Sequence, residues 1–121
     1  MGTGKRRWLF ILLIAAIAAL AVFFLTGREG PPSRPADIEG RIAAVEEQGR
    51  VLLVHTARSP EPDFRVRITT RTKVFQRQDG GIVRAETWSP AAGQQVRIWV
   101  DGPVLDSFPA QAAAGTILVL D

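Results

Sequence analysis

Cysteine and tyrosine are absent from this 121-residue sequence, and the only histidine is His55. Without cysteine the chain can form neither a disulfide bond nor a thiolate nucleophile. One histidine is too few for a zinc site, which takes several histidine or cysteine ligands. Nucleophilic catalysis needs a nucleophile, a base and a group that orients the base, and the sequence places no such set near His55. We therefore expect no cofactor, no metal ion and no catalytic residues, and we predict that the protein is not an enzyme.

Charged residues are missing from one long stretch near the N-terminus. Residues 8–25 are 18 consecutive apolar residues. At about 1.5 Å of helix rise per residue, this stretch nearly matches the ~30 Å hydrocarbon core of a bilayer. Three basic residues at 5–7 precede it and favour a cytoplasmic N-terminus. We predict a cytoplasmic flank at 1–7 and a single transmembrane signal-anchor helix at 8–26, with the rest of the chain outside the cytoplasm.

A cleaved signal peptide is the alternative for this stretch. The apolar region of a signal peptide is usually about 7–15 residues long, which is shorter than the run at 8–25. Small residues at positions 19 and 21 match a cleavage pattern, but the apolar residues 22–25 still follow them. If cleavage occurs, the remaining chain is secreted instead of anchored to the membrane.

A linker at 27–36 and one small domain at 37–121 follow the apolar run. Two glycines and three prolines in the linker exclude a continuing helix and favour an extended chain. The domain has ten basic and eleven acidic residues, so the formal charge of +3 comes from the flank and the linker. Nucleic-acid binding uses a basic domain or a basic face, and this domain has no basic excess.

Apolar residues recur at every second position in much of the domain, which is typical of β-strands. Ile38, Ile42 and Ala44, for example, share one face of the first predicted strand. An Asp-Gly pair at 79–80 lies between two strand-like runs and predicts a hairpin. The predicted strands lie at 37–46, 50–57, 64–71, 73–77, 82–84, 95–102 and 116–120.

No stretch of the domain predicts a helix long enough to cover a sheet. A sheet without such a cover must close on itself to bury its apolar face and to remove its edges. The sequence therefore predicts an all-β domain that forms a small, closed or partly closed barrel of five to six strands.

Three segments of the domain resemble a known family: IEGRI at 38–42, GQQVRIWVDG at 93–102 and VLDSFPAQA at 104–112. They resemble the YobA-type family of small bacterial envelope proteins, whose function is unknown, over about residues 37–121. The resemblance implies a secreted or lipid-anchored β-barrel of the oligonucleotide/oligosaccharide-binding (OB) type with no assigned activity. No cysteine follows the apolar run, so this chain lacks the lipid attachment site of the lipoprotein members.

Five residues form the candidate binding face. Arg65, Arg67 and Arg71 share the outward face of one predicted strand, and Arg97 and Trp99 share that of another. Guanidinium groups beside an exposed indole would suit an anionic polymer, a sugar or single-stranded nucleic acid. The alternative is a solvated strand face whose arginines pair with acidic residues and whose tryptophan covers a barrel end, since arginine at an edge also guards against aggregation.

Phe108, Pro109 and Gln111 form a second candidate segment. Pro109 removes a backbone donor where regular strand pairing would otherwise be expected. We expect the segment to cross one end of the barrel, with Phe108 buried and the Gln111 amide bonded to backbone groups that no ladder serves. The alternative is that this segment lies on the surface and faces a ligand.

From the sequence we predict a membrane-anchored, extracytoplasmic OB-like module that has a non-catalytic binding or interaction role at the bacterial cell envelope. Besides the membrane itself, its expected partner is an envelope protein or an anionic polymer. The alternative function is an OB-type binder of nucleic acid or another anionic polymer through the arginine and tryptophan face.

Overall fold

Seven β-strands and one short 3-10 helix make up residues 29–121, the part of the chain that the computed structural model describes. No helix within this part is long and apolar enough to span a membrane. The predicted flank at 1–7 and the predicted transmembrane helix at 8–26 lie outside the described residues. The elements are β1 (Ile38–Glu46), the 3-10 helix η1 (Glu47–Gly49), β2 (Val51–Thr56), β3 (Phe64–Arg67), β4 (Lys73–Gln78), β5 (Gly81–Arg84), β6 (Gln95–Val100) and β7 (Ala110–Val119).

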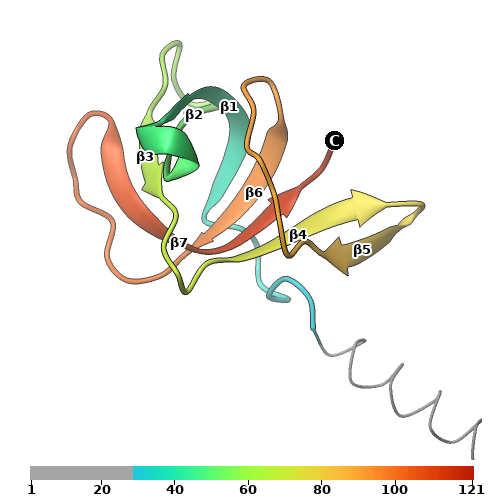
Figure 1. The fold of residues 1–121 in the computed structure, drawn as a ribbon. Coiled ribbons are helices and arrows are strands. Elements are labelled where there is room, and N and C mark those ends of the chain that lie inside the picture. The colour runs from blue at the N-terminus through green and yellow to red at the C-terminus, as the bar shows by residue number, and fades with distance from the viewer. Residues whose placement is uncertain (1–28) are drawn as a thin grey trace, which may run out of the picture.

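Five of the strands close into a barrel (Figure 1). Strand β1 pairs antiparallel with β2 and β6, β2 pairs antiparallel with β3, and β6 pairs antiparallel with β7. The ring closes where β3 runs parallel to β7, with Phe64 opposite Ala110 and Arg67 opposite Ala113. The prediction of an all-β barrel is confirmed, and closure explains how the sheet buries its apolar face without a covering helix.

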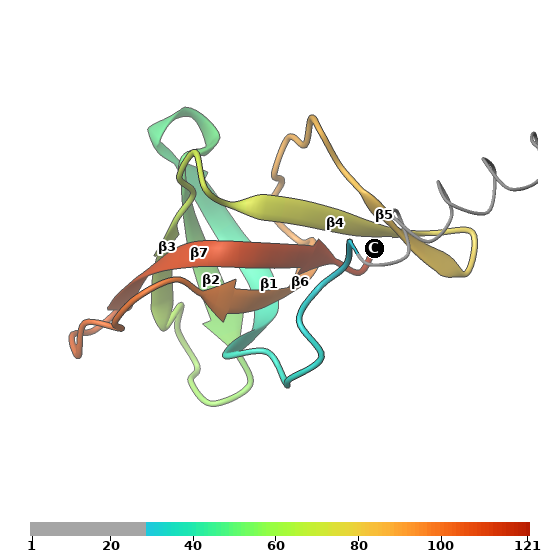
Figure 2. The same ribbon diagram turned by 90° about the horizontal axis from the view of Figure 1, so that it is seen from below.

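Strand β7 connects the barrel to the two remaining strands. Its residues 110–113 pair with β3, its residues 116–119 pair with β4, and its other edge pairs with β6. Strands β4 and β5 form a hairpin that extends out of the barrel (Figure 2). The sequence predicted only 116–120 as the last strand, because alanine is depleted in strands and residues 112–114 are all alanine. Here the ladder with β3 outweighs that weak local preference.

Aliphatic side chains from all five barrel strands fill the interior. A bulge in β1 shifts its register against β2 between Ile42 and Ala44. Val45 therefore packs against the core, in place of the predicted Ala44, because a bulge moves the following side chains to the other face. The buried residues of the core are Ile38, Ile42, Leu52, Val54, Val66, Val96, Ile98, Ala114, Ile117 and Val119.

Gly40 allows β1 to approach β2 closely. A Cβ atom at this position would lie 2.3 Å from the backbone oxygen of His55, which is far inside van der Waals contact. The clashing atom belongs to the backbone of a paired strand, so it cannot rotate away as a side chain can. Only glycine fits this position of β1 without a shift of one strand.

Residues 34–37, which we call the N-terminal strap, lie against the outer face of the sheet. The indole Nε1 of Trp99 donates a hydrogen bond of 2.9 Å to the carbonyl oxygen of Arg34. Part of the segment that the sequence predicts to be a linker is therefore packed on the barrel. Ala36 packs there against a second buried cluster, which consists of Phe75, Trp99 and Leu118.

Asp37 fastens the strap to β6. Its Oδ1 accepts a hydrogen bond of 2.9 Å from Arg34, and its Oδ2 accepts one of 2.8 Å from the backbone N–H of Val100. Its own backbone N–H donates to the carbonyl oxygen of Ile98 at 3.0 Å. The bond from Arg34 lowers the pKa of Asp37; burial opposes this effect, and the bond from Val100 adds to it.

Replacing Gly40 with alanine should destabilise the barrel by about 3 kcal/mol, the upper end of the usual cost of overpacking, because the clash is with backbone. Urea unfolding of the full-length protein measures the change. Gly30→Ala is the matched control, since a Cβ atom there would meet nothing within 4 Å. Equal stabilities of the two variants would contradict the close approach of β1 and β2.

Replacing Asp37 with asparagine should lower stability at neutral pH and remove part of its pH dependence. A carboxyl group whose pKa falls on folding stabilises the protein above its unfolded pKa of about 3.9, and this contribution is lost as the pH falls through the folded value. The stability difference between wild type and Asp37→Asn should therefore shrink below about pH 4. Denaturant unfolding at several pH values measures it, with Asp79→Asn in the exposed β4–β5 turn as the control. A difference that is constant down to about pH 2 would refute the role of Asp37.

Candidate functional site

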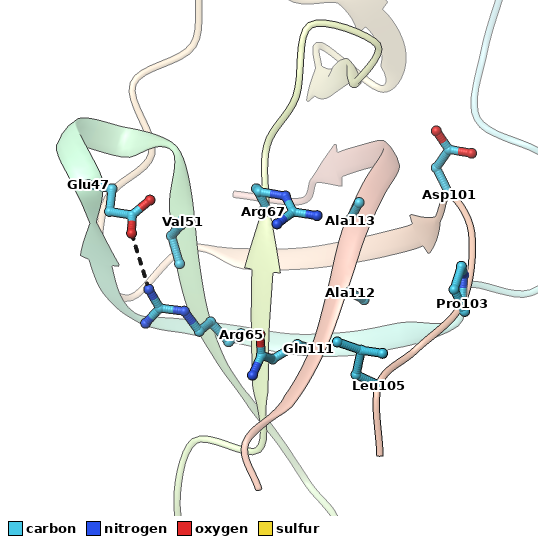
Figure 3. Close-up of a pocket in the computed structure, with 10 residues that line it drawn as sticks. All are labelled: Glu47, Val51, Arg65, Arg67, Asp101, Pro103, Leu105, Gln111, Ala112 and Ala113. Atoms are coloured by element: carbon cyan, nitrogen blue, oxygen red, sulfur yellow. Dashed lines mark hydrogen bonds and ion pairs between the residues drawn. The ribbon is translucent and has the colours of Figure 1, made fainter. Parts of the chain in front are cut away.

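A groove on the barrel surface is the strongest candidate for a functional site. It has a volume of about 400 Å³ and lies over β2, β3 and β7, between η1 and the loop from β6 to β7 (Figure 3). This volume is near the lower end of the roughly 300–1,000 Å³ that small-ligand pockets occupy. We call it the Arg67 groove. The strands contribute Val51, Arg65, Arg67, Gln111, Ala112 and Ala113 to its lining.

The groove forms because facing residues of β3 and β7 differ in size. In this parallel pair Arg65 lies opposite Gln111, and Arg67 lies opposite Ala113. Side chains alternate along a strand, so the two arginines point outward while Val66 between them is fully buried. The short side chain of Ala113 leaves a hollow beside the longer arginines and Gln111.

The loop from β6 to β7 forms one wall of the groove. Its Leu105 donates a backbone hydrogen bond of 2.8 Å to the carbonyl oxygen of Gln111, and the N–H of Gln111 donates back to Leu105 at 3.2 Å. The Leu105 side chain is 58% exposed and borders the groove together with Pro103. The loop thus adds apolar surface beside the polar side chains of the strands.

The two arginines of the groove differ in their partners. The Nη1 atom of Arg65 is 2.8 Å from Oε1 of Glu46, and its Nη2 atom is 3.4 Å from Oε1 of Glu47. The side chain of Arg67 is exposed, and its guanidinium makes no ion pair or hydrogen bond with any residue between 29 and 121. An exposed guanidinium that has no protein partner in this part of the chain can bind an anion.

Carboxylates lie on opposite sides of Arg67, as Figure 3 shows. Glu47 comes from η1, and Asp101 directly follows β6. Because opposite charges alternate across the groove, it is a mixed site with a central cation and two acidic rims. Such a site attracts a ligand that itself carries charges of both signs.

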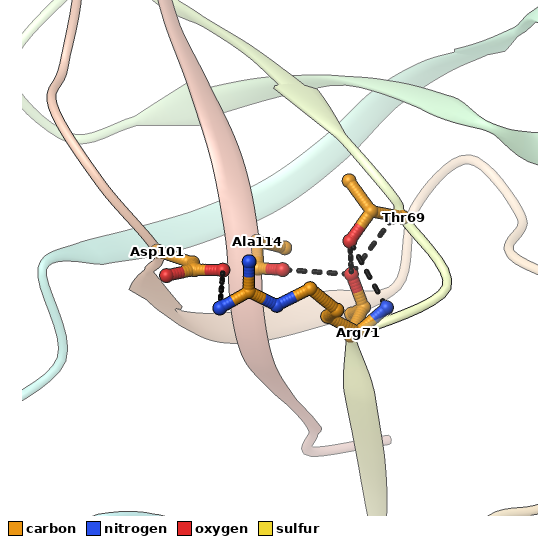
Figure 4. A network of polar contacts seen from close by, with 5 residues as sticks. Thr69, Arg71, Asp101 and Ala114 are labelled. Carbon is orange, nitrogen blue, oxygen red and sulfur yellow. Dashed lines mark hydrogen bonds and ion pairs between the residues drawn. The ribbon is translucent and has the colours of Figure 1, made fainter.

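The turn between β3 and β4 lies beside Asp101 (Figure 4). Its Arg71 carries a guanidinium 3.7 Å from the Asp101 carboxylate. The hydroxyl of Thr72 donates a hydrogen bond of 2.7 Å to the carbonyl oxygen of Ala114 on β7 and accepts one of 2.9 Å from the N–H of Thr69. The turn is therefore anchored on β7, next to the groove.

The arginines of the predicted binding face are only partly brought together. Arg65 and Arg67 line the groove side by side, and Arg71 reaches its rim through the ion pair with the rim carboxylate. Arg97 does not line the groove. Its Nε atom lies 3.3 Å from Oε1 of Glu39 on β1, which is the pairing that the alternative for this face expects.

The prediction of an exposed indole at Trp99 is wrong, because this residue is only 5% exposed. Strand alternation does direct Trp99 away from the barrel interior, since its neighbour Ile98 lies in the core. The N-terminal strap then covers the indole, and Arg34 occupies its only hydrogen-bond donor. Trp99 therefore cannot stack on a ligand while the strap is in place.

The prediction of a buried segment around Phe108 is also wrong. Phe108 is 67% exposed, and Gln111 is exposed as well. The chain does not cross a barrel end here, because β7 already begins at Ala110 and closes the barrel against β3. Pro109 ends the loop before β7, and its carbonyl oxygen accepts a hydrogen bond of 2.8 Å from the Ser107 hydroxyl. The side chain of Gln111 lines the Arg67 groove, and only its backbone is bonded to the loop, at Leu105.

Sequence reasoning did not identify Glu47, Asp101 and Leu105 as groove residues. They belong to a turn and a loop that become neighbours only when the barrel closes. A signal for the loop was present, since Leu105 is an apolar residue in a segment with strand breakers on both sides. For Glu47 no local pattern distinguished a groove residue from an ordinary turn residue.

His55 contacts the turn that follows β2. Its exposed ring nitrogen Nε2 bonds to the carbonyl oxygen of Ser59. Asp63 accepts hydrogen bonds from the backbone N–H of Thr56, at 2.9 Å, and from its hydroxyl. Burial acts to raise the pKa of Asp63, but the bonds from Thr56 lower it overall.

Between residues 29 and 121 no three histidine, cysteine or acidic residues are grouped as metal ligands.

Part of the chain is similar to a family without an assigned activity. Residues 67–121 match the model of a family described as a protein of unknown function (DUF3221). The matched part includes Arg67, Asp101 and Gln111 of the groove, but not Arg65 or Glu47. Searches of curated proteins and of solved structures give no match.

Because Phe108 is exposed, we expect its replacement to have little effect on the free energy of unfolding, which is the opposite of what a buried Phe108 would imply. Phe108→Ala should change the free energy of unfolding by less than about 0.5 kcal/mol, as exposed substitutions usually do. Trp99→Ala should cost about 3–5 kcal/mol, because it empties a buried site under the strap. Urea unfolding followed by circular dichroism measures both. A cost above about 2 kcal/mol for Phe108→Ala would contradict an exposed loop.

Proposed function

We propose that the protein is a non-catalytic binding module and that the Arg67 groove holds its ligand. One observation carries the proposal: the Arg67 guanidinium lies in a concave site of about 400 Å³ and has no partner between residues 29 and 121. Gln111 adds an amide and Leu105 adds an apolar side chain at the same place. Polar groups that converge beside apolar side chains in a concave site are the usual marks of a ligand site.

An OB-type barrel is our proposal for the fold that carries this site. Strands β1, β2 and β3 follow one another in the barrel, β3 runs parallel to β7, and β6 lies between β7 and β1. OB folds bind ligands on strands 2 and 3, between the loop joining strands 1 and 2 and the loop joining strands 4 and 5. The Arg67 groove, between η1 and the β6–β7 loop, corresponds to that position.

Family and location belong to the same proposal. The segments at 38–42, 93–102 and 104–112 support membership of the YobA-type family, and the match of residues 67–121 to a family of unknown function is consistent with it. The apolar run at 8–25 and its basic flank support a single-pass anchor at the bacterial cell envelope. An extracytoplasmic barrel would then present its groove to other envelope components.

A binder of nucleic acid or another anionic polymer is the second candidate. The two arginines of the groove favour it, because guanidinium groups bind backbone phosphates. Single-strand binders of the OB type also stack bases on aromatic side chains. None of the groove-lining residues is aromatic, and Trp99 is buried, so we rank this candidate below a module with a different ligand.

Capture from an envelope extract tests the proposal. The immobilised full-length protein should retain a partner, and Arg67→Glu should retain about tenfold less of it or lose it, because the central charge is inverted. Arg77→Glu is the matched control, since Arg77 is an exposed arginine of β4 that does not line the groove. Equal capture by Arg67→Glu and wild type, or equal losses in both variants, would contradict the groove as the binding site.

A further inference from the structure

We infer that the Arg67 groove recognises an extended peptide in which one acidic residue is flanked on each side by a basic residue. This inference rests on the proposed function, because it names the ligand class of the same groove. Its basis is the order of charges across the groove, from the Glu47 carboxylate through the Arg67 guanidinium to the Asp101 carboxylate (Figure 3).

Arg67 supplies the charge for the acidic residue of the peptide. The neighbouring Arg65 already pairs at 2.8 Å with Glu46, a carboxylate that does not line the groove, so its charge is largely neutralised. Arg67 is thus the groove arginine that has no partner between residues 29 and 121. A single guanidinium binds a single carboxylate well, because its N–H groups form two parallel hydrogen bonds with the two oxygens.

The carboxylates of Glu47 and Asp101 can each still bind a basic residue of the peptide. Asp101 pairs with Arg71 only at 3.7 Å, and the Arg71 side chain is 80% exposed. Such an exposed, long ion pair is weak and can be exchanged for a ligand cation. Glu47 is bound to Arg65 through Oε1, which leaves its second oxygen available to accept a further hydrogen bond.

An extended peptide can present three charges of alternating sign on one face. Its side chains on one face recur at every second residue, about 6.6 Å apart, so a basic, an acidic and a basic side chain can lie in line. The exposed amide of Gln111 can donate to and accept from the peptide backbone. The side chains between the charged ones point away from the groove, because side chains alternate along an extended chain.

A nucleic acid fits this order of charges poorly. It carries a phosphate at each nucleotide, so phosphates on either side of one bound to Arg67 approach Glu47 and Asp101. Like charges repel over a Debye length of about 8 Å at physiological ionic strength. Stacking cannot offset this repulsion, because none of the lining residues is aromatic.

Fluorescence anisotropy with three labelled probes tests the inference on the full-length protein. The probes are a blocked Lys-Ala-Glu-Ala-Lys peptide, the charge-inverted Glu-Ala-Lys-Ala-Glu peptide and a deoxythymidine decamer. We expect the first peptide to bind about tenfold more tightly than either of the others, which is the effect of one matched charge pair. Arg67→Glu should weaken this binding about tenfold or more, and Arg77→Glu should leave it unchanged.

The rim variants test the flanking basic residues separately. Glu47→Gln and Asp101→Asn should each lower the affinity for the first peptide and reduce the ratio of its affinity to that of the inverted peptide. Circular dichroism should show that both variants fold. The inference would be overturned if the decamer or the inverted peptide bound more tightly than the first peptide. If Arg67→Glu abolished that tighter binding, the groove would still be the binding site for a different ligand. Failure of the first peptide to bind, or binding that Arg67→Glu leaves unchanged, would also overturn it. The capture experiment decides the proposed function independently of these peptides.

Discussion

The parallel pairing of β3 with the beginning of β7 is the constraint on which the rest of the structure depends. Without it the barrel sheet would end in two free edges, one at β3 and one at residues 110–113. The pairing sets Arg65 beside Gln111 and Arg67 beside Ala113 on the outer surface. It also brings η1 and the β6–β7 loop to either side of that surface. The groove is therefore a consequence of barrel closure and needs no additional structural element.

Strand positions were largely predictable from the sequence, but which side chains of a strand face the core was predictable only up to a bulge in that same strand. Alternation is a local property, so it correctly identified the inward positions of Val66 and Ile98. In β7 both Ala114 and Ile117 face the core, although three positions separate them. The register shifts beside Gly115, where a Cβ atom would lie 3.2 Å from the backbone oxygen of Trp99. Such a shift depends on the partner strand, and no spacing rule within β7 reveals it.

The candidate site was predictable only in the part that belongs to one strand. Arg65 and Arg67 are two positions apart, so their common face follows from the pleat alone. Glu47 and Asp101 are distant in sequence and meet across the groove only through the closed barrel. Gln111 was singled out as an unusual polar residue, but its role was misread, because a strand that begins at residue 110 exposes it. Long-range pairing therefore decided the composition of the site.

The N-terminal strap gives this site a defined relation to the preceding chain. The sequence at 34–37 has a charged pair and a proline, which by themselves favour an extended spacer, and its packing partner Trp99 lies far along the chain. In the structure Asp37 binds the backbone of Val100, and the next residue, Asp101, is the acidic rim of the groove. Strap and groove thus meet at the same end of β6. The orientation of the groove relative to residue 34 is therefore fixed by hydrogen bonds and packing.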